Sequence, residues 1–321
     1  MKKQLLIAAV AATMGTAAIA DISLTGNMKV NYKSTDFDNA ATASTNNVTQ
    51  EGNLVLTGTN GGTKVHVEVA IDGDSSPDAT DNMRTEDVWL STNIGSVAVK
   101  TGTWNGSDTI MAADSGRSAG NWILSTDVSG VNVALEGDSN ASAVKATVKG
   151  DIAGVSAKYV MYGANTTTEK AKDELYLSTD VAGFGVTYAM IDSDATNSDA
   201  AAFTIAKEFN GVTVSYSDVD ADAGYTVTGD TAAFGDAATF MNIGDDATSL
   251  KLKTSMGGNT VSARFVQVDA LVAANDVDVN TFQLTRPLAN GTTLEVTYTD
   301  TDESTATTDK TVLDMELAVK F

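Results

Sequence analysis

Few residues of this 321-residue chain could perform catalysis. His66 is the only histidine and there is no cysteine, so a nucleophile–base pair would need this one imidazole, and no thiolate metal site can form. His66 lies between Lys64 and Glu68 in an alternating apolar–polar segment, as one more polar position of a wall. The chain contains no P-loop and no dinucleotide-binding glycine motif. The sequence therefore predicts no enzyme, no catalytic residue, no metal centre and no cofactor.

Carboxylates are the most abundant reactive groups. The chain has 42 acidic and 20 basic residues and a net charge of −22, which would repel the phosphates of nucleic acid. Many of these carboxylates lie in polar stretches such as 72–81, 218–222 and 300–303, and hard cations prefer oxygen ligands of this kind. The stretch DVDADAG, from Asp218, resembles half of an EF-hand loop but lacks the glutamate at its twelfth position. We interpret the carboxylates as a solvated acidic rim, at which weak Ca²⁺ binding remains an open alternative.

Basic side chains instead occur within alternating segments. In TKVHVEVAID (63–72) the residues Val65, Val67, Val69 and Ile71 share one face, and Lys64, His66 and Glu68 share the other. The same two-residue period separates apolar from charged positions in AVKATVKG (143–150), TSLKLKTSM (248–256) and VLDMELAVKF (312–321). Such a period is typical of a β-strand with one apolar and one polar face.

These strands are joined by short turns and longer polar loops in strict alternation. Glycine and asparagine mark the short turns, as two-residue hairpins require. A closed antiparallel barrel has two such unequal ends, and closure also satisfies every backbone amide in hydrocarbon. We count eighteen strands, with sixteen as the alternative: 22–33, 49–58, 63–72, 85–93, 96–103, 121–126, 131–137, 143–150, 155–162, 173–179, 185–192, 201–209, 212–219, 249–256, 260–269, 279–288, 292–300 and 311–321. The predicted fold is all-β, a transmembrane antiparallel β-barrel wide enough for an aqueous channel.

The first twenty residues have a different composition. Lys2 and Lys3 precede a short apolar run, and Ala18-Ile19-Ala20 has the form of a signal-peptidase site. We expect residues 1–20 to be a cleaved signal peptide for export and residues 21–321 to form a single barrel domain.

Several segments resemble the bacterial outer-membrane general porins. They are DISLTGNMKVNY, TEDVWLSTNIGSVAVKTGTWNG, the hairpins DELYLSTDVAGFGVTYAM and FTIAKEFNGVTVSYS, and the terminal ELAVKF. The resemblance implies an outer-membrane homotrimer with short periplasmic turns and longer external loops, in contact with the lipid bilayer and lipopolysaccharide. It implies a passive, water-filled channel for ions and small hydrophilic solutes. It also implies that the barrel-assembly machinery recognises Phe321 as an assembly signal.

The same resemblance places a pore-constricting third loop at residues 104–120. Its charged residues would be Asp108, Asp114 and Arg117, and Lys64 and Lys100 lie on the strands that flank it. The chain has only four arginines, so lysines would have to take the part that arginines play in the family's constriction. The other basic residues at lumen-facing parity, expected to line the pore, are Lys29, Lys145, Lys149, Lys158, Lys251, Lys253 and Arg264.

Two other classes of protein share parts of this pattern. An acidic secreted β-rich structural protein, such as a surface-layer or adhesin subunit, would have a similar composition, and a barrel could also anchor the outer membrane without conducting. The net negative charge favours cation passage and the wall lysines oppose it. The sequence therefore predicts a channel and leaves its ion selectivity open.

Overall fold

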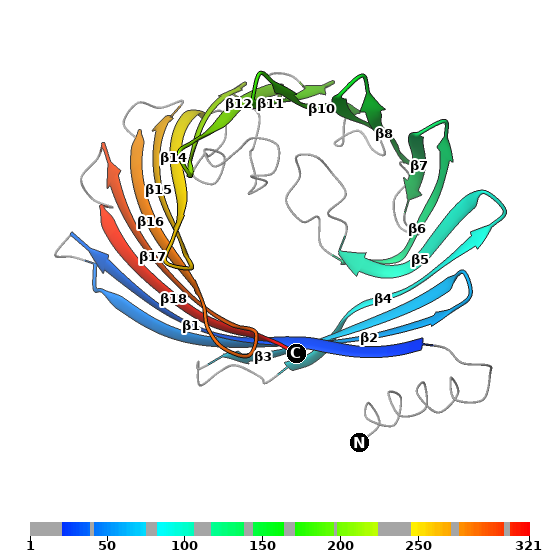
Figure 1. The fold of residues 1–321 in the computed structure, drawn as a ribbon, viewed down its shortest axis with the longest axis horizontal. Coiled ribbons are helices and arrows are strands. Elements are labelled where there is room, and N and C mark those ends of the chain that lie inside the picture. The colour runs from blue at the N-terminus through cyan, green and yellow to red at the C-terminus, as the bar shows by residue number, and fades with distance from the viewer. Residues whose placement is uncertain are drawn as a thin grey trace.

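The computed structural model describes residues 21–38, 42–74, 82–105, 117–137, 144–163, 171–195, 198–223, 245–270, 276–304 and 309–321. These residues form eighteen strands in one antiparallel sheet that closes on itself (Figure 1). The strands are β1 (Asp21–Phe37), β2 (Thr45–Asn60), β3 (Thr63–Asp74), β4 (Asn82–Ile94), β5 (Val97–Asn105), β6 (Arg117–Val128), β7 (Val131–Gly137), β8 (Lys145–Ile152), β9 (Val155–Tyr162), β10 (Lys172–Val181), β11 (Phe184–Ser193), β12 (Ala200–Phe209), β13 (Val212–Ala221), β14 (Asp246–Met256), β15 (Asn259–Asp269), β16 (Val277–Pro287), β17 (Thr292–Glu303) and β18 (Lys310–Lys320).

Each strand pairs with its neighbours in the chain, and β1 also pairs with β18. The prediction of eighteen strands is therefore confirmed, and the alternative of sixteen is wrong. No helix among the described residues is long and apolar enough to cross a membrane.

The short turns have the backbone that a two-residue hairpin needs. Asn210 and Gly211, between β12 and β13, both have positive φ, of 51° and 80°. This pair matches a type I′ turn, whose twist continues the right-handed twist of the strands. Gly257 and Gly258 make the same connection between β14 and β15, with φ of 59° and 80°. Such turns fix the register of each hairpin and so determine which side chains face the lumen.

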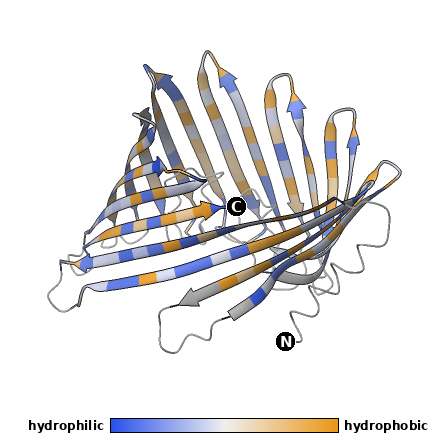
Figure 2. Ribbon diagram, turned by 60° about the horizontal axis from the view of Figure 1, so that its bottom comes forward, coloured by the Kyte–Doolittle hydropathy of each residue, from blue (hydrophilic) through white to orange (hydrophobic). Residues whose placement is uncertain are grey.

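The outer face of the barrel is apolar. Along β18, Leu313, Met315 and Leu317 are 36%, 37% and 46% exposed, whereas Glu316, between them in sequence, faces inward and pairs with Lys29. Figure 2 shows the alternating hydropathy along the strands. Large apolar side chains are exposed in this way on strands all around the sheet, which a water-soluble protein avoids. The face instead suits contact with lipid.

The barrel closes where β18 meets β1. The register runs from Asn27 opposite Lys320 to Phe37 opposite Lys310. Beyond it, the Gly26 N–H donates to the Phe321 carbonyl at 2.8 Å, and the Phe321 N–H donates to the Gly26 carbonyl at 3.0 Å. A β-carbon added to Gly26 would lie 2.7 Å from two ring carbons of Phe321 and 2.8 Å from the Asn53 carbonyl oxygen. The aromatic ring therefore covers the glycine, and no larger residue fits beneath it.

We predict that Gly26→Ala weakens barrel closure. The new methyl group must displace the Phe321 ring or the β2 backbone, and overpacking of this kind costs about 1–3 kcal/mol. The measurement is the temperature at which the folded band converts to the unfolded band in cold-loaded SDS gels. The control is Gly52→Ala, where the nearest atoms to the added carbon are 3.5 and 4.0 Å away. Equal conversion temperatures for the two variants would contradict the packing described for Phe321.

The inner wall as candidate functional site

A cluster of basic and aromatic side chains lies on the inner face of β3, β4 and β5. The indole ring of Trp89 stacks on the imidazole of His66, with centroids 4.8 Å apart and planes 7° apart. The Lys64 ammonium lies 5.3 Å from the centroid of the same indole, and the Lys100 ammonium lies 4.8 Å from it. Lys100 also lies 4.2 Å from the ring of Trp104, which is almost fully buried. Cation–π contacts therefore hold both predicted constriction lysines on the wall.

A glycine on β5 makes room for this cluster. Gly102 has φ of 143°, and an added β-carbon would lie 2.2 Å from the Val88 carbonyl oxygen and 2.6 Å from the Trp89 Cα. The β5 backbone thus passes directly against Trp89. No side chain could stand at this position without moving the indole that carries the two lysines.

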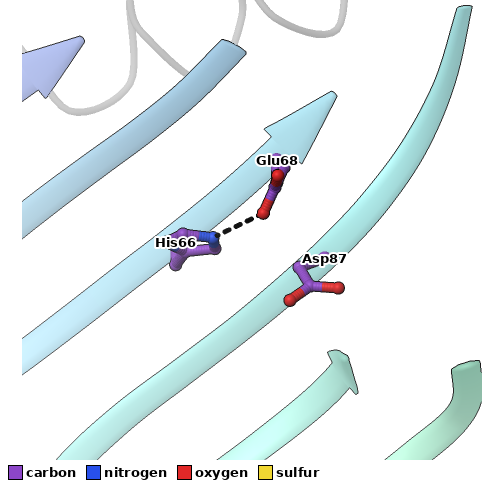
Figure 3. A group of neighbouring side chains, drawn as sticks. All are labelled: His66, Glu68 and Asp87. Atoms are coloured by element: carbon purple, nitrogen blue, oxygen red, sulfur yellow. Dashed lines mark ion pairs between the residues drawn. The ribbon is translucent and has the colours of Figure 1, made fainter. Parts of the chain in front are cut away.

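Next to Trp89, a β-bulge in β4 brings Asp87 into the cluster. Val67 pairs with Val88 but Val69 pairs with Thr85, so Glu86 and Asp87 together face Glu68. The ligand atoms of His66, Glu68 and Asp87 all lie within 4.8 Å of one another, and His66 Nε2 is 3.7 Å from Glu68 Oε2 (Figure 3). We predicted His66 and Glu68 as wall residues but missed Asp87. The sequence could have indicated Asp87, because it is two residues from Trp89 and a strand places such residues on the same face.

Basic residues face one another at two other places on the wall. Lys149 of β8 lies directly opposite Lys158 of β9, and Lys251 of β14 lies opposite Arg264 of β15. Arg264 donates a long hydrogen bond to Thr281 Oγ1, at 3.4 Å. Lys253 occupies the next inward position on β14. Two positive charges therefore lie directly opposite each other at each of these places on the wall.

The remaining predicted pore-lining lysines form ion pairs. Lys29 lies 2.9 Å from Glu51 and 3.7 Å from Glu316, and Lys145 lies 2.5 Å from Glu136. These pairs confine both lysines to the wall and offset their charge.

The inner face of β16–β18 and β1 forms an acidic concavity of about 490 Å³. Carboxylates outnumber basic groups in its lining, which contains Glu295, Glu303, Asp314 and Glu316 together with Lys33 and Lys310. Asn31 donates a hydrogen bond to Asp314 at 2.8 Å. The lumen therefore has an acidic sector beside its basic ones.

Part of the inner face is apolar, which the alternation of the sequence did not predict. Small aliphatic residues occupy inward positions near the long-loop ends of β9–β16 and are buried there: Val160, Ala189, Ile191, Ala200, Ala202, Val219, Ala221, Ala247, Val266, Val268 and Val279. Beside them, the fully buried carboxylate of Glu174 lies 2.9 Å from the Lys172 ammonium. The only sequence signal was the replacement of charged residues by alanine and valine at inward parity. The polar part of the wall is therefore not distributed evenly around the barrel.

Two of the predicted constriction residues, Asp108 and Asp114, lie outside the described residues. Arg117 begins β6, opposite Asn105, and its side chain is also outside the description. β5 and β6 extend into the range 104–120 expected for the third loop, so the segment between the two strands is 106–116. The role of these three residues in a constriction stays a prediction.

A closed eighteen-stranded barrel with an apolar outer face and charged groups inside is the architecture of an outer-membrane channel. Residues 6–306 match the family model described as Gram-negative porin, and the chain belongs to this family. No curated protein matches the sequence. The protein is thus an outer-membrane porin, a channel for small solutes.

Solved structures of outer-membrane proteins share this fold. OccK9 (OpdG) of Pseudomonas aeruginosa superposes with a TM-score of 0.73 at 13% identity, over 94% of this chain and 98% of that chain. The outer membrane protein opdK of P. aeruginosa gives 0.73 at 10% identity with the same coverage. A BenF-like porin of Pseudomonas fluorescens Pf-5 gives 0.71 at 12% identity, also with that coverage. At this level of identity the likeness concerns the fold and not the solute.

We predict that Lys100→Gln makes the channel less permeable to anions. The substitution removes one positive charge from the wall, and a unit charge a few ångströms from a passing ion in water is worth on the order of 1 kcal/mol or less. The chloride-to-potassium permeability ratio should therefore fall by about twofold. It is measured as the zero-current potential across a KCl gradient.

The matched control for that substitution is Lys207→Gln. Lys207 lies at outward parity on β12, with its ammonium 3.8 Å from the ring of Phe184. Its removal changes the net charge by the same amount without touching the lumen. If both variants shift the potential equally, Lys100 has no local effect on permeation.

Proposed function

We propose that this porin is a passive diffusion channel that favours small hydrophilic solutes carrying anionic groups. The observation that carries this proposal is the set of opposed basic pairs, Lys149–Lys158 and Lys251–Arg264. Each pair places two positive charges side by side on the inner face, where clusters of basic residues favour anions. Lys64 and Lys100 add a third basic group on β3 and β5.

The net negative charge of the chain, in contrast, favours the passage of cations. The chain as a whole is strongly acidic, and a negative vestibule concentrates cations. Charges on the wall act on a solute at much shorter range than those on the surface, which salt screens over about 8 Å at physiological ionic strength. We therefore give the wall groups more weight than the net charge.

Several features of the assembled protein are part of the same proposal. We infer cleavage after Ala20, recognition of Phe321 by the barrel-assembly machinery, and a homotrimer. The carboxylates of the external loops would hold Ca²⁺ or Mg²⁺ against anionic lipopolysaccharide. The apolar outer face and the close packing of Phe321 on Gly26 are consistent with these assignments.

The test is conductance of the refolded chain 21–321 in a planar bilayer. We expect stepwise, long-lived openings that need no energy source, and a zero-current potential that moves toward cation selectivity when Lys149 and Lys251 are both replaced by glutamine. A heat-modifiable, membrane-embedded protein without openings would indicate an anchoring barrel. A double variant with unchanged selectivity would show that the basic pairs do not set the preference.

A further inference from the structure

We propose that His66, Glu68 and Asp87 form a binding site for a divalent transition-metal ion in the lumen wall. One imidazole and two carboxylates form a mixed nitrogen–oxygen donor set, which suits Zn²⁺ and its neighbours. Mg²⁺ and Ca²⁺ prefer oxygen ligands alone. Nothing in the linear sequence joins these three residues, because the third comes from a different strand.

The spacing of the three donors fits a metal ion of this kind. Zinc binds histidine nitrogen at about 2.0–2.1 Å and carboxylate oxygen at about 2.0–2.2 Å in tetrahedral geometry, so two ligands of one ion are about 3.4 Å apart. His66 Nε2 and Glu68 Oε2 are 3.7 Å apart, close to this separation. All three ligand atoms lie within 4.8 Å of one another, so the widest separation closes by rotation of a carboxylate. Figure 3 shows His66 and Glu68 on β3 and Asp87 beside them on the neighbouring strand β4.

The surroundings hold the donors in this arrangement. The stacked indole of Trp89 fixes the plane of the imidazole. The bulge in β4 places Asp87 beside Glu68, in the way that bulges redirect side chains at functional sites. The side chain of His66 is 15% exposed and that of Glu68 is 22% exposed, so the donors are sheltered from bulk water yet open to the lumen.

The neighbouring lysines determine how tightly the ion is held. The ammonium groups of Lys64 and Lys100 lie over the Trp89 ring, next to the site, and oppose a third cation. The two carboxylates offset them. The site therefore binds the metal ion but also releases it, as a binding site within a conduction path must. A bound ion would add two positive charges to the wall and would favour anions further.

The first experiment compares Zn²⁺ with Mg²⁺ on single channels. Both ions screen surface charge equally, so the difference between them reports specific binding. We expect ZnCl₂, but not MgCl₂ at the same concentration, to lower conductance and shift the zero-current potential toward anion selectivity, with reversal by EDTA. No difference between the two salts would overturn the proposal.

The second experiment assigns the effect to the three residues. His66→Asn, Glu68→Gln and Asp87→Asn should each raise the half-effective Zn²⁺ concentration roughly tenfold or more, because each removes a ligand. The matched control is Glu295→Gln. It removes a lumen carboxylate four strands away around the sheet, on β17, and should leave the Zn²⁺ response unchanged. A Zn²⁺ response that survives His66→Asn would place the site elsewhere.

Direct binding gives a result that does not depend on conductance. Equilibrium dialysis is carried out with Zn²⁺ in excess Mg²⁺, which occupies the oxygen-only sites of the acidic loops. It should find one Zn²⁺ per wild-type chain and much less per His66→Asn chain at the same free Zn²⁺ concentration. Heat-modifiable mobility in SDS gels verifies that each variant is folded. Equal zinc binding by the two folded chains would overturn the proposal.

Discussion

The hydrogen bonds that join β1 to β18 are the constraint on which the rest of the structure depends. Each unsatisfied backbone group in hydrocarbon costs several kcal/mol, so a sheet can span a bilayer only if its first and last strands pair. Here they do so along the entire length of β18, and the covered Gly26 marks the end of the seam. Once the ring closes, every other strand must present one face to lipid and one to the lumen. The composition of each strand follows from that division.

The lumen is divided into sectors rather than evenly charged. Basic pairs occupy parts of β3–β5, β8–β9 and β14–β15, and carboxylates gather on β17 and β18. Buried aliphatic residues cover the long-loop ends of β9–β16. A solute with separated charges meets attraction on one side and repulsion on the other. Orientation during passage therefore becomes a means of selection that pore width alone does not provide.

Much of the fold could be predicted from the sequence, because each strand has a period of two and each short turn has its own glycine or asparagine. The eighteen expected segments correspond one to one with β1–β18. Parity also placed Lys64, Lys100 and Lys251 on the inner face. The contacts of these residues could not be predicted, since they depend on register between strands: neither the Lys251–Arg264 pair nor the position of Asp87 beside Glu68 is visible within one segment. We did not predict the apolar inner face around Val219, because alternation of side chains distinguishes the two faces of a strand but does not require the inner face to be polar.

The extra residue in β4 has an effect beyond the cluster at Trp89. In a regular ladder without the bulge, Val69 would lie opposite Glu86. With the bulge, Val69 lies opposite Thr85 and Ala70 lies opposite Arg84. One inserted residue thus inverts the phase of the strand, so that Arg84 takes an inward position and Thr85 an outward one. A charged side chain facing lipid costs up to about 2–4 kcal/mol at mid-bilayer and less near the interface. Because β4 has one residue more than β3 at this point, deleting Glu86 would remove the bulge and leave Arg84 opposite Ala70. Pairing of the complete strand without the bulge would instead turn Arg84 toward the lipid, so the bulge is what keeps this arginine in the water.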